Sequence, residues 1–129
     1  MYMSSIFTKI INNELPSYKV YEDDYVIAIL DLNPIQKGHT LVIPKQEVDQ
    51  LFELDEMYFD KMMHRVRYLA QVIKAKTNCA RVCVFVEGYG VPHVHVHLVP
   101  TNSPHDFDKS LVYKASTEEL EEMQKALQS

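Results

Sequence analysis

Three histidines, His93, His95 and His97, alternate with apolar residues in the second half of the chain. Side chains two residues apart point to the same face of a β-strand. The spacing therefore predicts a strand with three imidazoles on one face and an apolar surface on the other. Alternate residues of a strand lie about 6.6 Å apart, so neighbouring rings could act on one ligand. Because solvated strand faces normally mix Thr, Lys, Glu and Ser, a face made of histidine alone indicates a chemical role.

Three roles are open for such a face. A neutral imidazole nitrogen can attack an electrophile and form a covalent intermediate, while neighbouring rings orient it and bind negative charge. Imidazoles at alternate strand positions can also ligate zinc, iron or copper, with His39 as the candidate for a further ligand. The third role is structural, with the rings buried and hydrogen-bonded. The residues favour nucleophilic or acid–base chemistry, because Glu87 is the one carboxylate near the histidines in sequence and no cysteine stands at a zinc spacing.

The composition is that of an ordinary soluble globular protein. Of its 129 residues, 47% are hydrophobic and 24% are charged. The net charge of -5 and the scattered lysines argue against a nucleic-acid partner. No segment approaches the roughly 18 apolar residues of a membrane span, and residues 1–9 do not resemble a signal peptide. We therefore expect a cytoplasmic protein without membrane contact, in which Cys79 and Cys83 remain unbridged and act as small buried hydrophobic residues.

The strands that must position the histidines follow from β-branched and aromatic runs bounded by turn residues. The first two form a hairpin across Asp23 and Asp24, and the last carries the three histidines. Strands are expected over residues 18–22, 25–31, 39–43, 80–87 and 93–99.

Helices are expected at both ends of the chain and in its middle. Ser4 or Ser5 caps a short helix over residues 6–11. Asp55 begins a long helix that runs to about Lys76, with apolar residues at three- and four-residue spacing on one face. Residues 116–119 have the capping-box spacing and open a last helix through 127. This order predicts an α+β fold with an antiparallel sheet. We expect a single domain over residues 1–129, with a core at about 5–100 and a C-terminal extension at 101–129.

Residues 93–99 resemble the histidine-triad (HIT) signature in full. The likeness extends in register over roughly residues 5–100, because three further blocks are similar to the family. These blocks are the N-terminal segment 5–16, the hairpin at 21–31, and the segment 33–45 that contains Asn33, Pro34, Gly38 and His39. The resemblance implies the HIT-like fold, with a five-stranded antiparallel sheet and one long helix. It also implies a homodimer in which the two sheets join.

The resemblance implies a nucleotidyl hydrolase or transferase that needs no cofactor. Its substrate would be a purine nucleoside phosphoramidate, an acyl adenylate or a dinucleoside polyphosphate, cleaved at the α-phosphate. His95 would be the nucleophile and form a nucleotidyl-histidine intermediate. The backbone carbonyl of His93 would hold the other ring nitrogen of His95, and His97 would contact the α-phosphate. His39 would support the cluster from the neighbouring strand.

The resemblance also carries over a nucleotide pocket. Asp31 matches the acidic residue that binds the ribose hydroxyls, as an ionised carboxylate can. His64 and His105 fall outside the pattern and are interpreted as surface or packing residues. The remaining nucleotide-binding candidates are apolar residues and one glycine: Phe7, Ile29, Leu30, Leu32, Gly90 and Val91.

The chain departs from the common family pattern in three places. Many relatives have a structural zinc bound by two cysteines and a histidine, where this chain has Ser5, Thr8 and Val48, so that metal site is expected to be missing. Val86 replaces an asparagine that contacts the nucleotide. The loop before the triad is shortened to residues 88–92 and lacks the hydroxyl that helps protonate the leaving group. A Val-Pro pair before the triad and a C-terminal helix over 116–127 resemble one branch of the family.

Two other hypotheses remain open. The first is a metal-dependent hydrolase that uses His39, His93, His95 and His97 as ligands. The second is a nucleotide-binding sensor or interaction protein that keeps the fold with little turnover. Stoichiometric metal in the purified protein would favour the first, and tight nucleotide binding without hydrolysis would favour the second.

Overall fold

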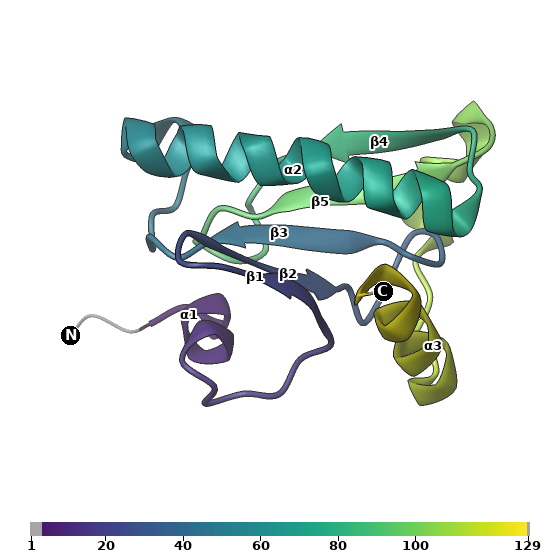
Figure 1. Cartoon of the computed structure of the whole chain (residues 1–129), viewed down its shortest axis with the longest axis horizontal. Coiled ribbons are helices and arrows are strands. Elements are labelled where there is room, and N and C mark those ends of the chain that lie inside the picture. The colour runs from purple at the N-terminus through teal and green to yellow at the C-terminus, as the bar shows by residue number, and fades with distance from the viewer. Residues whose placement is uncertain (1–3, 129) are drawn as a thin grey trace.

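A twisted antiparallel sheet with the strand order β1-β2-β3-β5-β4 organises the chain (Figure 1). The computed structural model describes residues 4–128, and within this range the sheet has five strands. The predicted α+β class is confirmed. The strands are β1 (Lys19–Glu22), β2 (Val26–Leu30), β3 (Thr40–Pro44), β4 (Arg81–Phe85) and β5 (Val96–Thr101).

Helices cover both faces of the sheet (Figure 1). The long helix α2 (Glu56–Thr77) lies across one face, and its buried stripe includes Met62, Leu69 and Ile73. The short helix α1 (Ile6–Ile11) packs on the other face through Phe7 and Ile10. Two apolar clusters result, one on each side of the sheet. Successive residues of β2 alternate between these clusters, as the period of two requires.

The helix ends follow local capping rules. Ser5 is the N-cap of α1 and accepts a hydrogen bond from the backbone N–H of Thr8 at 3.1 Å. The last helix, α3 (Thr117–Gln128), begins beyond Ser116, whose hydroxyl accepts from the N–H of Glu119 at 3.1 Å. Helix α2 ends at Asn78, which has the left-handed conformation common at helix C-termini. These helices are therefore confirmed within about one residue of their expected bounds.

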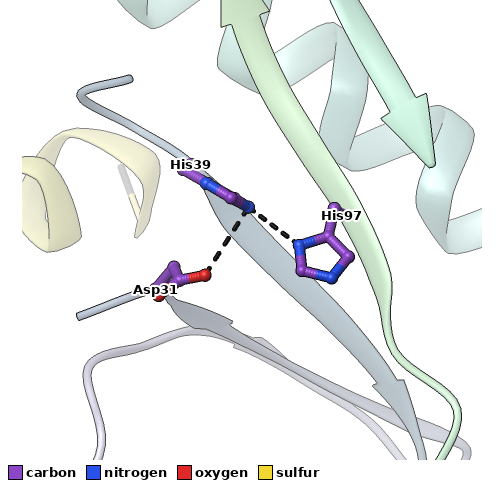
Figure 2. A group of neighbouring side chains, drawn as sticks. All are labelled: Asp31, His39 and His97. Atoms are coloured by element: carbon purple, nitrogen blue, oxygen red, sulfur yellow. Dashed lines mark hydrogen bonds and ion pairs between the residues drawn. The ribbon is translucent and has the colours of Figure 1, made fainter. Parts of the chain in front are cut away.

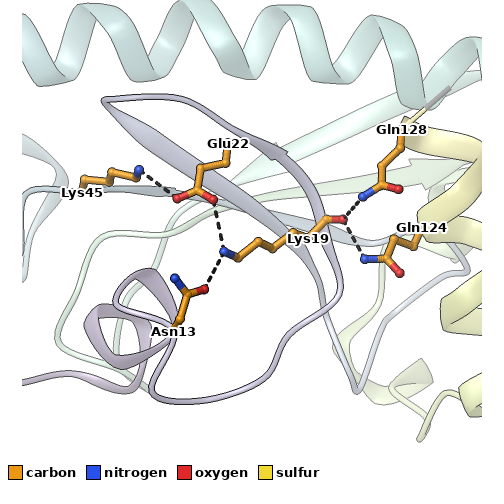
Figure 3. A network of polar contacts seen from close by, with 6 residues as sticks. All are labelled: Asn13, Lys19, Glu22, Lys45, Gln124 and Gln128. Atoms are coloured by element: carbon orange, nitrogen blue, oxygen red, sulfur yellow. Dashed lines mark hydrogen bonds and ion pairs between the residues drawn. The ribbon is translucent and has the colours of Figure 1, made fainter.

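Helix α3 covers the outer edge of β1 (Figure 3). The side-chain amides of Gln124 and Gln128 both donate to the backbone carbonyl of Lys19, at 3.0 and 2.8 Å. The Lys19 ammonium in turn contacts Asn13 and Glu22, at 3.0 and 3.1 Å. An edge strand presents unpaired backbone groups that invite association, and here side chains of α3 satisfy one of them. Strand β4 forms the opposite edge of the sheet.

The segment between β5 and α3 folds back over the loop that joins β2 to β3. It contains two short 3-10 turns, η2 (Pro104–Asp106) and η3 (Lys109–Leu111). Its backbone groups bond to that loop. Tyr113 N–H donates to the Pro34 carbonyl at 3.2 Å, and Ala115 N–H donates to the Leu32 carbonyl at 3.1 Å. The C-terminal extension is therefore tied to the loop that leads into His39.

One boundary differs from expectation in a way that matters for the site. Strand β5 begins at Val96, not at His93. The backbone before it bonds elsewhere, because His93 N–H donates to Val91 O at 2.8 Å and Val94 N–H donates to Val48 O at 2.9 Å. Over residues 4–128, no helix has the length and apolar character that crossing a membrane requires.

Candidate active site

The three histidines lie on one face of the sheet although only His97 belongs to a paired strand. The residues that alternate with them, Val94, Val96 and Leu98, pack in the core beneath α2. The imidazoles of His95 and His97 lie side by side, with ring centroids 4.9 Å apart. Phe7 contacts the rings of His95 and His93 in edge-on geometry, at centroid distances of 4.9 and 5.9 Å. The expected imidazole face is therefore present, and helix α1 borders it.

His95 has a fixed tautomer. Its Nδ1 lies 2.8 Å from the backbone carbonyl of His93, and a carbonyl oxygen only accepts hydrogen bonds. Nδ1 therefore carries the proton, and Nε2 of the neutral ring keeps its lone pair. That nitrogen has the electronic character that a nucleophile requires.

His97 has the opposite tautomer, which follows from its hydrogen bond with His39; Figure 2 shows this contact. The N–H of Ile35 donates to His39 Nδ1 at 3.0 Å, so the proton of the neutral His39 ring must be on Nε2. His39 Nε2 then donates to His97 Nδ1 at 2.9 Å. His97 consequently carries its own proton on Nε2. Two neighbouring rings thus present complementary atoms: Nε2 of His95 accepts, and Nε2 of His97 donates.

Burial keeps the rings of His97 and His39 neutral. It lowers the pKa of His97 from its ordinary value of 6.5 to about 3, and the nearby charges of His95, His39 and Lys109 act in the same direction. Burial also lowers the pKa of His39, although the carboxylate of Asp31 opposes this effect. The Asp31 Oδ2 atom lies 3.6 Å from His39 Nε2 (Figure 2). The tautomers deduced above for His39 and His97 are therefore the forms present near neutral pH.

His93 is held by protein groups on both sides of its ring. Its Nε2 donates to the carbonyl of Pro44 at 2.8 Å, so its Nδ1 is an acceptor. The hydroxyl of Ser5 donates to that Nδ1 at 2.7 Å. Burial is the main cause that lowers the pKa of His93. The side chain of His93 is therefore fixed in place, and the backbone carbonyl of the same residue orients His95.

Glu47 completes the support from the start of α1. Its Oε1 accepts from the Ser5 backbone N–H at 2.8 Å and from the Thr8 hydroxyl. Glu47, the neighbour of Val48, is therefore the residue whose side chain contacts Ser5 and Thr8. The side chain of Val48 packs against the core beneath α2. A hydrogen-bonded cluster of Ser5, Thr8, Glu47 and His93 stands where the sequence comparison placed a zinc site.

Asp31, His39 and His97 could in principle hold a metal ion, since one donor atom from each lies within 4.8 Å of the others. Two nitrogens and a carboxylate are a donor set that zinc accepts. To bind an ion through Nε2, however, His39 would have to move its proton to Nδ1, which faces the Ile35 N–H donor. Both nitrogens of His93 already have protein partners, so His93 offers no further ligand atom. The geometry suits proton ordering better than the four-histidine metal site.

The structure places the nucleotide-pocket candidates unequally. Phe7 and Ile29 are buried on the imidazole face, and Val91 packs against the same cluster. Leu30 lies in the core on the opposite face, so its side chain does not line this pocket. Leu32 is 53% exposed beyond the end of β2. Gly90 has open space around it, with no atom within 4 Å of where a Cβ would stand.

Besides Glu47, two further residues of the site, Phe85 and Lys109, were not predicted from the sequence. The ring of Phe85 stacks on His97 with centroids 4.0 Å apart and planes at 8°, which fixes the imidazole plane. Lys109 lies over the ring of Phe85, with its Nζ 5.5 Å from the ring centroid. Phe85 pairs with His97 across β4 and β5. Both residues lie in expected strands, so this contact could have been predicted if the register of the two strands had been known. Nothing in the local sequence indicated Lys109.

The antiparallel sheet, the crossing helix and the alternating histidines together define the histidine-triad class. The family model of the HIT domain matches residues 12–103. The chain is 33% identical to a Hit-like protein from Bartonella henselae, described as involved in cell-cycle regulation. The two structures agree with a TM-score of 0.86 over 99% of this chain and 98% of that one. An uncharacterized HIT-like protein of Borreliella burgdorferi is 39% identical over 102 residues, covering 74% of this chain and 73% of the relative. The chain belongs to the HIT family.

Two further relatives carry named activities. An adenosine 5'-monophosphoramidase of Saccharomyces cerevisiae is 36% identical over 96 residues, covering 74% of this chain and 61% of that enzyme. An adenylylsulfatase of Arabidopsis thaliana is 34% identical over 100 residues, covering 74% of this chain and 51% of that enzyme. Enzymes named for hydrolysis of adenylyl compounds are therefore among the proteins that this chain resembles.

Proposed function

We propose that the protein is a nucleotidyl hydrolase or transferase that cleaves at the α-phosphate of a purine nucleotide through a covalent intermediate on His95. The substrate classes are phosphoramidates, acyl adenylates and dinucleoside polyphosphates. The observation that carries the proposal is the pair of opposite tautomers, which leaves a lone pair on His95 Nε2 and an N–H on His97 Nε2 in rings whose centroids lie 4.9 Å apart. The names of the yeast and plant relatives support an adenylyl substrate.

In the first step, His95 Nε2 attacks the α-phosphorus and the bond to the leaving group breaks, so that group departs with the electron pair. The His93 carbonyl accepts from Nδ1–H and stabilises the positive charge that develops on the ring. His97 Nε2–H donates to an oxygen of the α-phosphate. In the second step, water attacks the phosphorus and the P–N bond breaks, which releases the nucleotide and restores His95. The proton that water loses balances the one that the leaving group gains.

The remaining polar group beside the triad is assigned to the sugar. Asp31 stands just beyond β2, and its Oδ1 accepts from the N–H of Asn33 at 2.9 Å, which fixes the carboxylate. We assign its free acceptor capacity to the ribose hydroxyls, with Phe7 and Ile29 on the side of the base. An apolar surface of this kind stacks on any base and selects little among them.

Trapping of the intermediate tests the proposal. The protein is mixed with adenosine 5'-phosphoramidate labelled at phosphorus, quenched in alkali and separated from free nucleotide. Labelled protein is expected for the wild type and for the control His64→Asn, an exposed histidine on α2. His95→Asn should give no labelled protein and retain less than about one tenth of the turnover, while still binding AMP. Full turnover by His95→Asn would refute the assignment, and nucleotide binding without turnover in the wild type would favour a sensor.

We also propose a homodimer that joins two sheets through β4. Helix α3 already covers the β1 edge, whereas Val84 on β4 is 48% exposed. Unprotected edge strands favour pairing with another chain. Light scattering should give about twice the 15.0 kDa chain mass. A mass near that of one chain would contradict the dimer and leave the hydrolase proposal standing.

A further inference from the structure

The C-terminal extension brings a lysine to the border of the triad. Lys109 opens the 3-10 turn η3 and contacts two groups of strand β4 and the residues after it. Its Nζ lies 5.5 Å from the centroid of the Phe85 ring and 2.7 Å from Glu87 Oε2. Phe85 stacks directly on His97. One aromatic ring therefore connects the ammonium of Lys109 to the imidazole that faces the α-phosphate.

The segment that carries Lys109 is anchored well enough to place it. Phe107 packs edge-on against Phe85, with centroids 5.3 Å apart. The amide of Gln36 donates to the backbone carbonyl of Asp106 at 3.0 Å. The hydrogen bonds from Tyr113 and Ala115 hold the far end of the segment to the loop before His39. The extension thus forms a wall of the site, while the lysine side chain itself stays 63% exposed and able to swing.

Lys109 carries a positive charge, whereas the buried histidines His39 and His97 do not. His39 and His97 are neutral near pH 7 because burial lowers the pKa of each. They donate hydrogen bonds but supply no net positive charge. Lys109 places a positive charge beside this pair, with its Nζ 5.5 Å from the centroid of the Phe85 ring that stacks on His97. A group with negative charge attached beyond the α-phosphate would therefore find its cationic partner in Lys109.

We propose that Lys109 is a specificity-determining residue that binds the leaving group when that group is an anion, such as phosphate or sulfate. This inference rests on the proposed function. In the free protein the ammonium of Lys109 forms an ion pair with Glu87. This ion pair is exposed to solvent and is therefore weak. The anionic leaving group takes the place of Glu87, and Lys109 swings toward it. The protein would thereby prefer mixed anhydrides over phosphoramidates whose leaving group is a neutral amine.

Two substrates that share the AMP half test this inference. Adenosine 5'-phosphosulfate releases sulfate, an anion, and adenosine 5'-phosphoramidate releases ammonia. For Lys109→Ala, kcat/KM should fall about tenfold or more with the phosphosulfate, the usual effect of losing one charge-assisted hydrogen bond. It should stay within about twofold with the phosphoramidate. Lys109→Arg should restore most of the loss. Lys114→Ala, which removes the same charge from an exposed residue of the same segment, should change neither value.

The outcomes separate the inference from the function on which it rests. If the wild type releases AMP from both substrates and Lys109→Ala slows both equally or neither, the inference is overturned and the hydrolase proposal survives. If the wild type releases AMP from neither substrate and forms no labelled protein, both fall. Because the phosphoramidate rate reports on folding of the variant, a selective loss with the phosphosulfate is the supporting result.

Discussion

The ring of His93 and the hydroxyl of Ser5 are joined by a hydrogen bond of 2.7 Å, although 88 positions separate them in the chain. Ser5 is also the N-cap of α1, and Glu47 holds its backbone N–H. The first turn of this helix is therefore part of the support for the His93 carbonyl, which orients His95. The cap of α1 and the position of His95 therefore depend on the same hydroxyl group.

We expect Ser5→Ala to lower kcat more than it raises KM, because the backbone carbonyl that holds His95 loses its support while the nucleotide contacts remain. Loss of the N-cap should also lower the free energy of unfolding by about 1–2 kcal/mol. Steady-state kinetics and urea unfolding measure the two effects. Ser4→Ala is the matched control, since Ser4 is exposed. An unchanged kcat in a destabilised Ser5→Ala protein would show that the hydroxyl acts on stability alone.

His39→Ala should allow His97 to adopt both of its neutral tautomers. Without the Nε2–H of His39, the tautomer of His97 is no longer imposed, and the Ile35 N–H loses its acceptor. We expect turnover to fall by about tenfold or more, the usual contribution of a positioned hydrogen-bond donor. Long-range nitrogen–proton NMR should show the Nε2–H tautomer of His97 in the wild type and a mixture in the variant. A single Nε2–H tautomer in the variant would mean that His39 does not set it.

The alternation of histidine and apolar residues predicts correctly which side chains share a face. The period of two persists through Val94 even though its backbone lies outside β5 and bonds to Val48. The start of the strand could not be predicted from the same pattern, because pairing depends on which backbone lies alongside. The face assigned to Leu30 failed for a related reason, since adjacent residues of β2 point to opposite clusters.

The supporting residues of the site were less accessible than the histidines. Glu47 contacts Ser5 and Thr8, which lie 42 and 39 positions away in the chain. A single carboxylate between Lys45 and Val48 belongs to no periodic pattern, so the direction of its side chain could not be predicted. Lys109 lies in a segment of 3-10 turns without helical or strand spacing. Long-range contacts of irregular segments are set by tertiary packing, and one sequence does not encode them in any local pattern.

Stability should fall as the solution is acidified below about pH 6.5. The pKa of His97 is about 3 in the folded protein and near 6.5 when unfolded, so the unfolded state binds the extra proton between these values. The stabilising effect is complete above pH 6.5 and is lost as the pH falls toward 3, by about 1.4 kcal/mol per pH unit. Urea unfolding between pH 4.5 and 7.5 measures the slope. His97→Asn should make it shallower, and an identical slope would contradict the buried neutral ring.

Tyr89 should not act as the general acid for the leaving group. Its side chain is 94% exposed on the shortened loop, and Gly90 beside it offers only a backbone N–H. Phosphoramidates with alkyl-amine leaving groups need protonation, which typically contributes ~10²–10⁴-fold, whereas good leaving groups need it far less. We expect these phosphoramidates to be cleaved more slowly than an adenylate with a good leaving group. Tyr89→Phe should change the rate with neither substrate. A preference for the phosphoramidate that survives Tyr89→Phe would refute the expectation.

Residues from distant parts of the chain surround the triad, so the order of their synthesis limits when the site can form. Ser5 is synthesised before the triad, and Tyr113 and Ala115, which bond to the loop before His39, are synthesised after it. A growing polypeptide leaves the ribosome from its N-terminus, and a domain folds as a unit once its partners have emerged. The nascent chain therefore cannot complete the contacts around the triad until residue 115 has been translated. A translation product that stops after the triad would lack the bonds of Tyr113 and Ala115 to the loop before His39.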